Sequence, residues 1–200
     1  MIINPAIVWA HAGASHTAIG PIRAERQHRV GATLRAFLLF PLALFAAHAQ
    51  TTATLQLDPL VTNGAVGTTA VVKLRFDRGT AKAPALGALD VTVNYDPESA
   101  QVVNVAWGDP ASTDSLEPPG TGSLSGIGTT LPGVIALYKV ALAPAASLDS
   151  TQPQALALAT ITFKLTTAAT NILTISVRAL ADSAGATVLP TLRGGFLVIN

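Results

Sequence analysis

The sequence predicts an all-β fold, an antiparallel β-sandwich with about seven or more strands. Two observations lead to this prediction: several short runs alternate between apolar and polar residues, and turn-forming residues separate these runs. A strand with such a pattern has one face for a core and one face for water, which is typical of an antiparallel sheet covered on one side. Two such sheets can bury their apolar faces against each other.

The alternation is clearest in residues 88–95, where the two faces differ in character. One face is apolar and the other is small or polar: Leu89, Val91, Val93 and Tyr95 against Ala88, Asp90, Thr92 and Asn94. Asp96-Pro97 follows and favours a turn, because proline fixes the φ angle that a type I turn needs at this position. The pattern therefore predicts a strand whose polar face meets water.

The same alternation predicts strands over residues 71–76, 103–107, 160–165 and 173–179. Their apolar faces consist of Val72, Leu74 and Phe76; of Val103, Val105 and Trp107; of Ile161, Phe163 and Leu165; and of Leu173, Ile175, Val177 and Ala179. Two further strands are expected, although neither alternates clearly. The phase of residues 134–140 is ambiguous, and the wholly apolar run 196–199 fits a buried strand.

The longest segment without alternation is 108–133, which contains six glycines and four prolines. A compact domain rarely has so long a loop without a reason. We therefore expect either a mobile surface loop or a short strand around residues 123–127. Signals for a helix are limited to one turn over residues 143–148, and residues 182–185 favour a hairpin turn that ends in a glycine.

A separate leader precedes these strands. Residues 36–47 form an unbroken apolar run of 12 residues, AFLLFPLALFAA, which follows Arg29 and Arg35 and leads into Ala47-His48-Ala49. This is the layout of a secretory signal peptide. The run is shorter than the ~20 apolar residues that a membrane-spanning helix needs, and Pro41 in its middle disfavours a buried helix.

We therefore expect a leader over residues 1–49, cleavage near Ala49, and one domain over residues 50–200. Residues 1–28 precede the signal and indicate an over-long gene start or a long charged region. The mature protein is expected to be secreted, to the extracellular space, the cell surface or the periplasm, without a stable membrane anchor.

The composition of residues 50–200 excludes several classes of function. Eight basic residues stand against ten acidic residues, a net charge of −2 without a basic patch, so nucleic acid is not expected as a partner. The chain has no cysteine, and its four histidines all precede residue 50. The usual catalytic triads and zinc sites need these side chains. We therefore expect no enzyme and no cofactor.

Several strings resemble cohesin domains. Residues 86–97, LGALDVTVNYDP, and residues 102–105, VVNV, resemble the third strand, the turn and the fourth strand of that family. Residues 158–164, LATITFK, resemble the cohesin strand that usually reads leucine-alanine-x-isoleucine-x-phenylalanine. Residues 181–185, ADSAG, and 195–199, GFLVI, resemble the final cohesin hairpin. Their order and spacing extend over nearly all of the expected domain.

The resemblance implies a jelly-roll β-sandwich of about nine strands. It also implies a non-catalytic binding function, because cohesins in cellulosomes bind dockerins, which are calcium-loaded helical modules carried by enzymes. Cohesins of this kind often carry asparagine-x-aspartate early in the third strand, facing the partner. Asp90 falls on the aspartate position, whereas Ala88 occupies the asparagine position and cannot make the same hydrogen bonds. The resemblance thus implies a dockerin-like or other protein partner on the face of Asp90, Thr92, Asn94 and Ala88.

The sequence leaves two other functions and one ion site open. The fold of cohesins is related to cellulose-binding modules of families 2 and 3, so a carbohydrate-binding module acting on polysaccharide is an alternative, with Tyr138 and Trp107 as possible contacts. A structural subunit of a surface or secretion assembly is the second alternative. Asp109, Asp114 and Glu117 are weak calcium candidates, but no EF-hand spacing is present, so a metal-free acidic loop is favoured.

Overall fold

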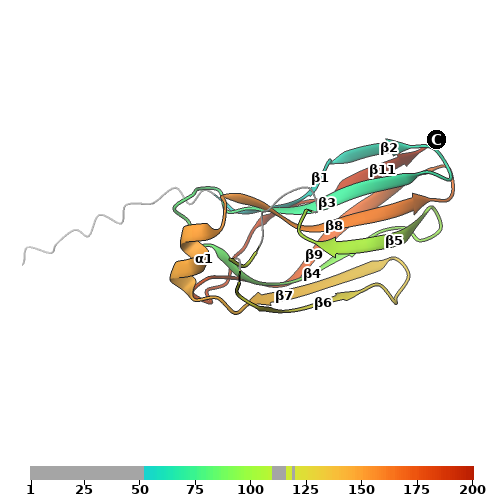
Figure 1. Ribbon diagram of the computed structural model, residues 1–200. Helices are drawn as coiled ribbons and strands as arrows, with labels where there is room; N and C mark the ends of the chain where they lie inside the picture. Colours follow the sequence, from blue (N-terminus) through green and yellow to red (C-terminus); the bar gives the residue numbers. More distant parts are fainter. Residues whose placement is uncertain (1–51, 110–115, 119) are drawn as a thin grey trace, which may run out of the picture. The chain divides into compact units, whose positions relative to one another are not determined.

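The computed structural model describes residues 52–109, 116–118 and 120–200. Within these residues, eleven strands form two sheets that pack face to face, and one short helix lies at the end of the sandwich away from the C-terminus (Figure 1). The expected antiparallel β-sandwich is confirmed, and the described residues form eleven strands where the resemblance implies about nine. The predicted signal peptide and the cleavage site at Ala49 lie outside the described residues.

The first sheet has five strands. In spatial order they are β10 (Thr191–Arg193), β1 (Thr54–Asp58), β3 (Thr69–Asp77), β8 (Ala155–Leu165) and β5 (Ala100–Trp107). All neighbours are antiparallel except β1 and β10, which run parallel. The outer face of this sheet carries the ion pairs Lys73–Asp109 and Arg75–Asp58.

The second sheet has six strands. In spatial order they are β2 (Val61–Gly64), β11 (Gly195–Ile199), β9 (Ala169–Asp182), β4 (Leu86–Asn94), β7 (Val134–Ala141) and β6 (Ser123–Gly128). Only β2 and β11 run parallel. Strand β6 confirms the short strand that the sequence offered as one reading of residues 108–133.

The helix α1 (Ala145–Thr151) is somewhat longer than the single turn expected over residues 143–148. It packs its buried Leu148 toward the end of the sandwich. In the part of the chain that the structure describes, no helix has the length and apolar character to cross a membrane.

The core lies between the two sheets and follows the predicted alternation. Leu89, Val91 and Val93 are nearly inaccessible to solvent, whereas the residues between them on β4 are partly exposed. Phe163 is completely buried and meets Tyr95 edge-on, with a ring-centre distance of 5.3 Å. Four predicted core aromatics therefore point inward or pack against the core: Phe76, Tyr95, Trp107 and Phe163.

Strand β5 departs from its predicted phase. The pairing of β5 with β8 shifts between Val102 and Asn104, so Val103 is an extra residue in the ladder, a β-bulge. Val103 is therefore 59% exposed, while Val102, Val105 and Trp107 pack against the core. The prediction that Val103 faces the core was wrong, because strict alternation cannot anticipate an inserted residue.

Strand β11 is also less buried than its apolar sequence suggested. Leu197 and Ile199 point into the core, but Phe196 lies on the opposite face and is 45% exposed. Phe196 pairs with Val61 of β2 and Ile172 of β9, which are exposed as well. The run 196–199 is therefore a strand with one dry face, and not a strand buried on both faces.

Candidate functional site

The outer face of the six-stranded sheet, called here the β4 face, carries the row of side chains that the sequence singled out. Ala88, Asp90, Thr92 and Asn94 alternate with the buried residues of β4, and each is partly exposed. Strand β4 lies between β9 and β7, so this row runs along the middle of the sheet. Asp90 and Thr92 have no side-chain hydrogen bond or ion pair to any described residue, which leaves the Asp90 carboxylate available as an acceptor.

On the β9 side of this row the surface is rich in hydroxyl groups. Thr174 pairs with Asn94 and Ser176 pairs with Thr92. The Asn94 amide donates long hydrogen bonds to the hydroxyl oxygens of Thr174 and Ser176, at 3.4 and 3.3 Å. A register shift beside Asp90 leaves Arg178 as an extra, exposed residue next to Ala179, the partner of Asp90. This half of the face offers hydroxyl groups and the positive charge of Arg178.

On the β7 side the surface is apolar. Tyr138 lies directly across from Asp90 and is 53% exposed. Its ring lies over Gly126 of β6, where any added Cβ atom would overlap the ring. Leu124 and Val140 are paired neighbours on the same face and are also exposed. We call Leu124, Tyr138 and Val140 the apolar cluster; the sequence did not identify it, because the phase of residues 134–140 was ambiguous.

The phase of β7 places a lysine on the inner side of the strand. Lys139 shares the inner side of β7 with Ile135 and Leu137 and is only 7% exposed. Its ammonium nitrogen lies 3.0 Å from a carboxylate oxygen of Glu117 and 5.0 Å from the ring centre of Trp107. The charge is thus neutralised inside the fold, and Tyr138 and Val140 are turned outward.

The two carbohydrate candidates lie in different places. Tyr138 belongs to the β4 face, whereas Trp107 belongs to β5 of the other sheet and packs between the sheets under Lys139. They do not form one flat platform for a sugar ring. On the β4 face, the exposed aromatic side chains of the described residues are Tyr138 and, on the more distant strand β11, Phe196.

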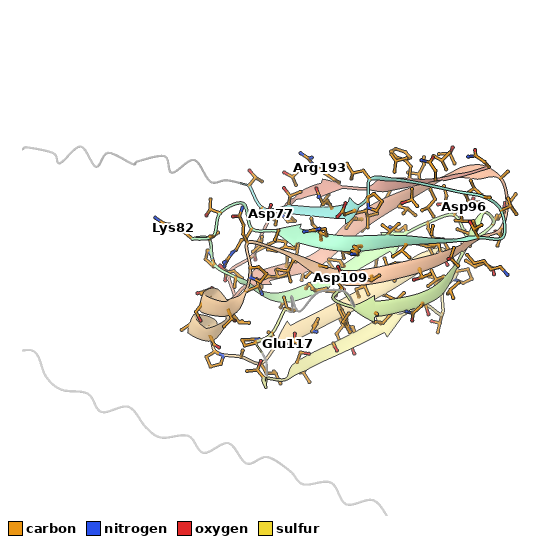
Figure 2. All side chains as sticks on the ribbon, turned by 45° about the horizontal axis from the view of Figure 1, so that its top comes forward. Asp77, Lys82, Asp96, Asp109, Glu117 and Arg193 are labelled. Carbon is orange, nitrogen blue, oxygen red and sulfur yellow. The ribbon has the colours of Figure 1, made fainter. Side chains whose placement is uncertain are left out.

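The acidic loop residues are bound to lysines. Asp109 lies 2.6 Å from Lys73, and Glu117 pairs with Lys139, so the two carboxylates point to different elements (Figure 2). Asp114 lies outside the described residues. No group of three potential ligands among His, Cys, Asp and Glu occurs in residues 52–109, 116–118 and 120–200. The geometry of Asp109 and Glu117 is that of structural ion pairs.

The end of β4 is held by an asparagine of β9. Asn171 is 1% exposed, accepts a hydrogen bond from the backbone N–H of Asp96 at 2.9 Å, and donates to the Asp96 carbonyl at 2.8 Å. The Asp96 carboxylate accepts hydrogen bonds from the Ser99 hydroxyl and the Glu98 N–H, and these bonds lower the pKa of Asp96. The predicted turn after β4 is thus fixed by four side-chain contacts.

The start of β4 is held from the region of α1. Gln152 is 4% exposed and bonds both the N–H and the carbonyl of Leu86, at 2.7 and 3.0 Å, and the carbonyl of Leu116 at 3.0 Å. Asp149 accepts hydrogen bonds from the Ala85 N–H and the Ser183 hydroxyl, both at 2.7 Å. Because β4 is fixed at both ends, the row of Asp90 is presented on a rigid support.

The contacts of Asp149 predict a dependence of stability on pH. The Ala85 N–H, then the Ser183 hydroxyl and last the charge of Arg78 lower the pKa of Asp149 below 3.8. A lowered pKa in the folded state stabilises the fold above the unfolded pKa, and this contribution is lost as the pH falls through the folded value. We expect Asp149→Asn to be less stable than wild type at neutral pH, and the difference to close below pH 3.8. Urea denaturation over a pH series measures the difference in the free energy of unfolding between the two proteins. A difference that does not change with pH would contradict the assignment of this effect to the Asp149 carboxylate.

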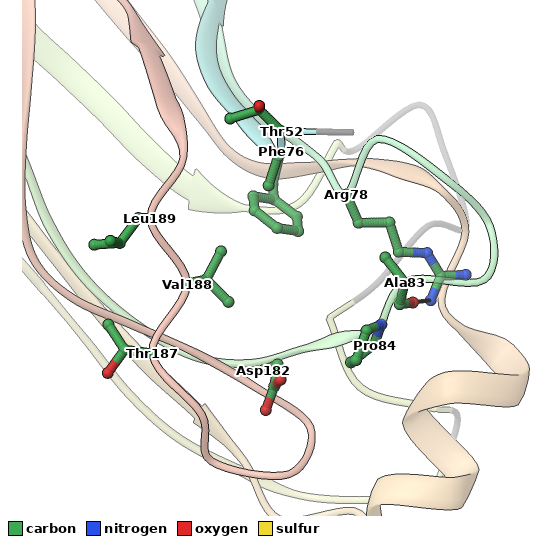
Figure 3. Close-up of a pocket in the computed structure, with 10 residues that line it drawn as sticks. Thr52, Phe76, Arg78, Ala83, Pro84, Asp182, Thr187, Val188 and Leu189 are labelled. Atoms are coloured by element: carbon green, nitrogen blue, oxygen red, sulfur yellow. Dashed lines mark hydrogen bonds between the residues drawn. The ribbon is translucent and has the colours of Figure 1, made fainter. Parts of the chain in front are cut away.

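A cavity of about 460 Å³ lies at the α1 end of the sandwich, between the ends of β1, β3 and β9 (Figure 3). Its charged lining residues are engaged within the fold. The Arg78 guanidinium donates to the carbonyls of Ala83 and Gln152, and the Asp182 carboxylate accepts the N–H groups of Ala184 and Ala186. The charged groups of this cavity therefore have structural partners, and none of its lining residues belongs to the row on β4.

Comparisons with known proteins agree with this architecture. The family model described as Cohesin domain matches residues 55–192. The sixth cohesin of scaffoldin B from Acetivibrio cellulolyticus, solved in complex with a Cel5 dockerin mutant, is similar with a TM-score of 0.59 at 19% identity, over 75% of this chain and 100% of that chain. A non-cellulosomal cohesin from the archaeon Archaeoglobus fulgidus has a TM-score of 0.53 at 15% identity, over 74% and 91%. A type II cohesin of Acetivibrio cellulolyticus has a TM-score of 0.57 at 12% identity, over 73% and 95%. No curated protein matches the sequence.

Proposed function

Because this chain belongs to the cohesin domain family, we propose that it is an exported, non-catalytic binding module that docks a dockerin-like protein on the β4 face. Cohesin domains are binding modules without catalytic activity, and several similar structures were solved as complexes with dockerins. The observation that carries the choice of face is the Asp90 carboxylate, which is partly exposed, has no partner among the described residues, and lies in the middle of a strand fixed at both ends.

The chemistry of the β4 face suits a helical protein partner. The apolar cluster of Leu124, Tyr138 and Val140 can bury the apolar side of a helix, which is the main source of affinity in such interfaces. Asp90 and the hydroxyl groups of β9 can receive hydrogen bonds beside it. A flat, rigid sheet loses little conformational entropy on binding. Ala88 leaves a short, apolar position where many cohesins offer an asparagine, so the partner is expected to place an apolar group there.

Asp90→Ala is expected to weaken partner binding about tenfold or more, because a charge-assisted hydrogen bond at an interface is lost. Folding should be unchanged, since the Asp90 carboxylate has no partner among the described residues. The partner is recovered from the native secretome with wild-type protein, identified by mass spectrometry and titrated by calorimetry. Glu98→Ala removes an exposed carboxylate away from the β4 face and serves as the control. Equal binding by Asp90→Ala, or a recovered partner without a helical dockerin-like domain, would count against the proposal.

Export is part of the same proposal and rests on the leader described above. Expression of the full chain in a secreting host is expected to release a protein that begins at Gln50 into the periplasm or medium. Sequencing of its N-terminus measures the cleavage site. Retention of the full chain in the cytoplasm would contradict the proposed export.

Polysaccharide binding is the second candidate, and Tyr138 is the observation that favours it. The exposed ring over Gly126 leaves one aromatic face open to solvent, and sugar rings stack on such faces. Affinity electrophoresis on cellulose, xylan and chitin distinguishes the two candidates. Retardation that Tyr138→Ala abolishes would support the polysaccharide, and unchanged mobility on all three would exclude it in favour of the protein partner.

A further inference from the structure

The two sheets have four edges, and three of them carry features that discourage pairing with another chain. Strand β10 has three residues, β2 has four, and β5 is interrupted by the bulge at Val103. Short edges and bulges are devices by which proteins protect exposed strands. Strand β6 has six residues, and its register with β7 is continuous from Ser123 to Gly128. It is therefore the least protected edge of the described sandwich.

The sequence of β6 has no protective residue either. It reads SLSGIG, without a charge and without a proline. Leu124 is 62% exposed and Ile127 is 37% exposed. Charged side chains and prolines are the other common means of blocking an edge, so the chemistry of β6 agrees with its geometry.

The free backbone groups of β6 can be assigned from one hydrogen bond. The Leu142 N–H donates to the Gly122 carbonyl at 3.0 Å, so the polar groups of Gly122 point toward β7. Backbone groups alternate in direction along an antiparallel ladder. The N–H and C=O groups of Ser123, Ser125 and Ile127 therefore point away from β7, and none of them bonds to another described residue on that side.

We propose that β6 pairs in antiparallel fashion with β6 of a second copy of this chain, across a two-fold axis at Gly126. In this register the polar groups of Ser125 meet those of Ile127 of the second copy, with Gly126 facing itself. Leu124 then lies opposite Gly128 of the second copy, which has no side chain to displace. No like charges meet at the axis, because β6 has none.

The self-complementary order of β6 is what favours a second copy over an unrelated extended peptide. Across a two-fold axis the same strand must fit itself, because each residue pair occurs twice, once in each direction. Here the large Leu124 of one copy lies opposite Gly128 of the other, and the small Ser125 lies opposite Ile127. The axis is perpendicular to the sheet, so the outer faces stay on the same side. The two sheets join into one continuous sheet with both β4 faces exposed side by side. The proposed dimer does not rest on the partner proposed above, although Leu124 belongs both to the apolar cluster and to the paired edge.

Ser125→Pro tests this pairing directly. Its N–H points away from β7, so proline removes a donor needed by the second copy while all hydrogen bonds between β6 and β7 remain. Residues 50–200 are used, because the core cluster consists of residues between Ala53 and Ile199. Sedimentation equilibrium over a concentration series is expected to give a dimer for wild type and for Ser125→Ala. For Ser125→Pro the dissociation constant should rise about tenfold or more, with an unchanged thermal midpoint at concentrations where both proteins are monomeric.

Leu124→Lys is the second variant, in case proline disturbs the strand. It places a charge on the exposed edge without touching the backbone and is also expected to give monomers. A wild-type protein that is monomeric at every concentration would overturn the proposal. So would a dimer that persists in a folded Ser125→Pro or Leu124→Lys protein. A crystal structure in which β6 pairs with an extended peptide from another protein would contradict the proposal that a second copy of this chain pairs with β6.

Discussion

Glu117→Leu is expected to lower the free energy of unfolding by about 3–5 kcal/mol, because it leaves the Lys139 ammonium buried without its counter-charge. The side chains of Lys139 and Glu117 are 9% and 17% exposed, so water cannot replace the lost carboxylate easily. The ring of Trp107 remains near the ammonium but supplies only a weaker, cation–π attraction. Urea denaturation followed by circular dichroism measures the change.

Two controls make this result specific. Asp58→Ala breaks the ion pair with Arg75, whose side chains are 43% and 40% exposed, and it is expected to cost less than about 1 kcal/mol. The double variant Glu117→Leu with Lys139→Met replaces both charges by apolar groups and should recover most of the stability. A double variant no more stable than Glu117→Leu would show that the loss comes from disturbed packing and not from an unpaired lysine.

Among truncations of single core side chains, Phe163→Ala is expected to lower the free energy of unfolding the most, by about 3–5 kcal/mol. Phe163 is completely buried, packs edge-on against Tyr95, and lies on β8, which pairs with both β3 and β5. The matched control is Phe196→Ala, which removes the same ring from a position that is 45% exposed. It should cost less than half as much, because less apolar surface leaves the core. If both variants lose the same free energy of unfolding, Phe196 does not point toward solvent, and the orientation of β11 described above is contradicted.

The contrast between these two phenylalanines illustrates what the sequence could predict. Phe163 sits in a regular alternation with threonine and lysine, so its burial was predicted and is confirmed. Phe196 sits in a wholly apolar run, where alternation gives no phase. Its exposure is decided by the neighbours that the fold brings beside it, Val61 and Ile172, which lie far away in the sequence.

The inward turn of Lys139 could not be predicted for a similar reason. A lysine normally marks the wet face of a strand, and this one is buried because Glu117 and Trp107, from other segments, receive its charge. Tyr138 and Val140 alternate with Ile135, Leu137 and Lys139 and therefore lie on the β4 face. By contrast, the outward row on β4 could be predicted, because Leu89, Val91 and Val93 fix its phase by themselves. The role of that row as a docking surface stays a prediction.

The most direct measurement is an NMR titration of labelled residues 50–200 with the domain recovered from the secretome. If the β4 face docks the partner, the largest chemical-shift changes should occur in the signals of Ala88, Asp90, Thr92 and Tyr138. The signals of Val103 and Lys164, on the outer side of the five-stranded sheet, should stay unchanged. Shifts concentrated at Val103 and Lys164, with the β4 residues unmoved, would contradict the account.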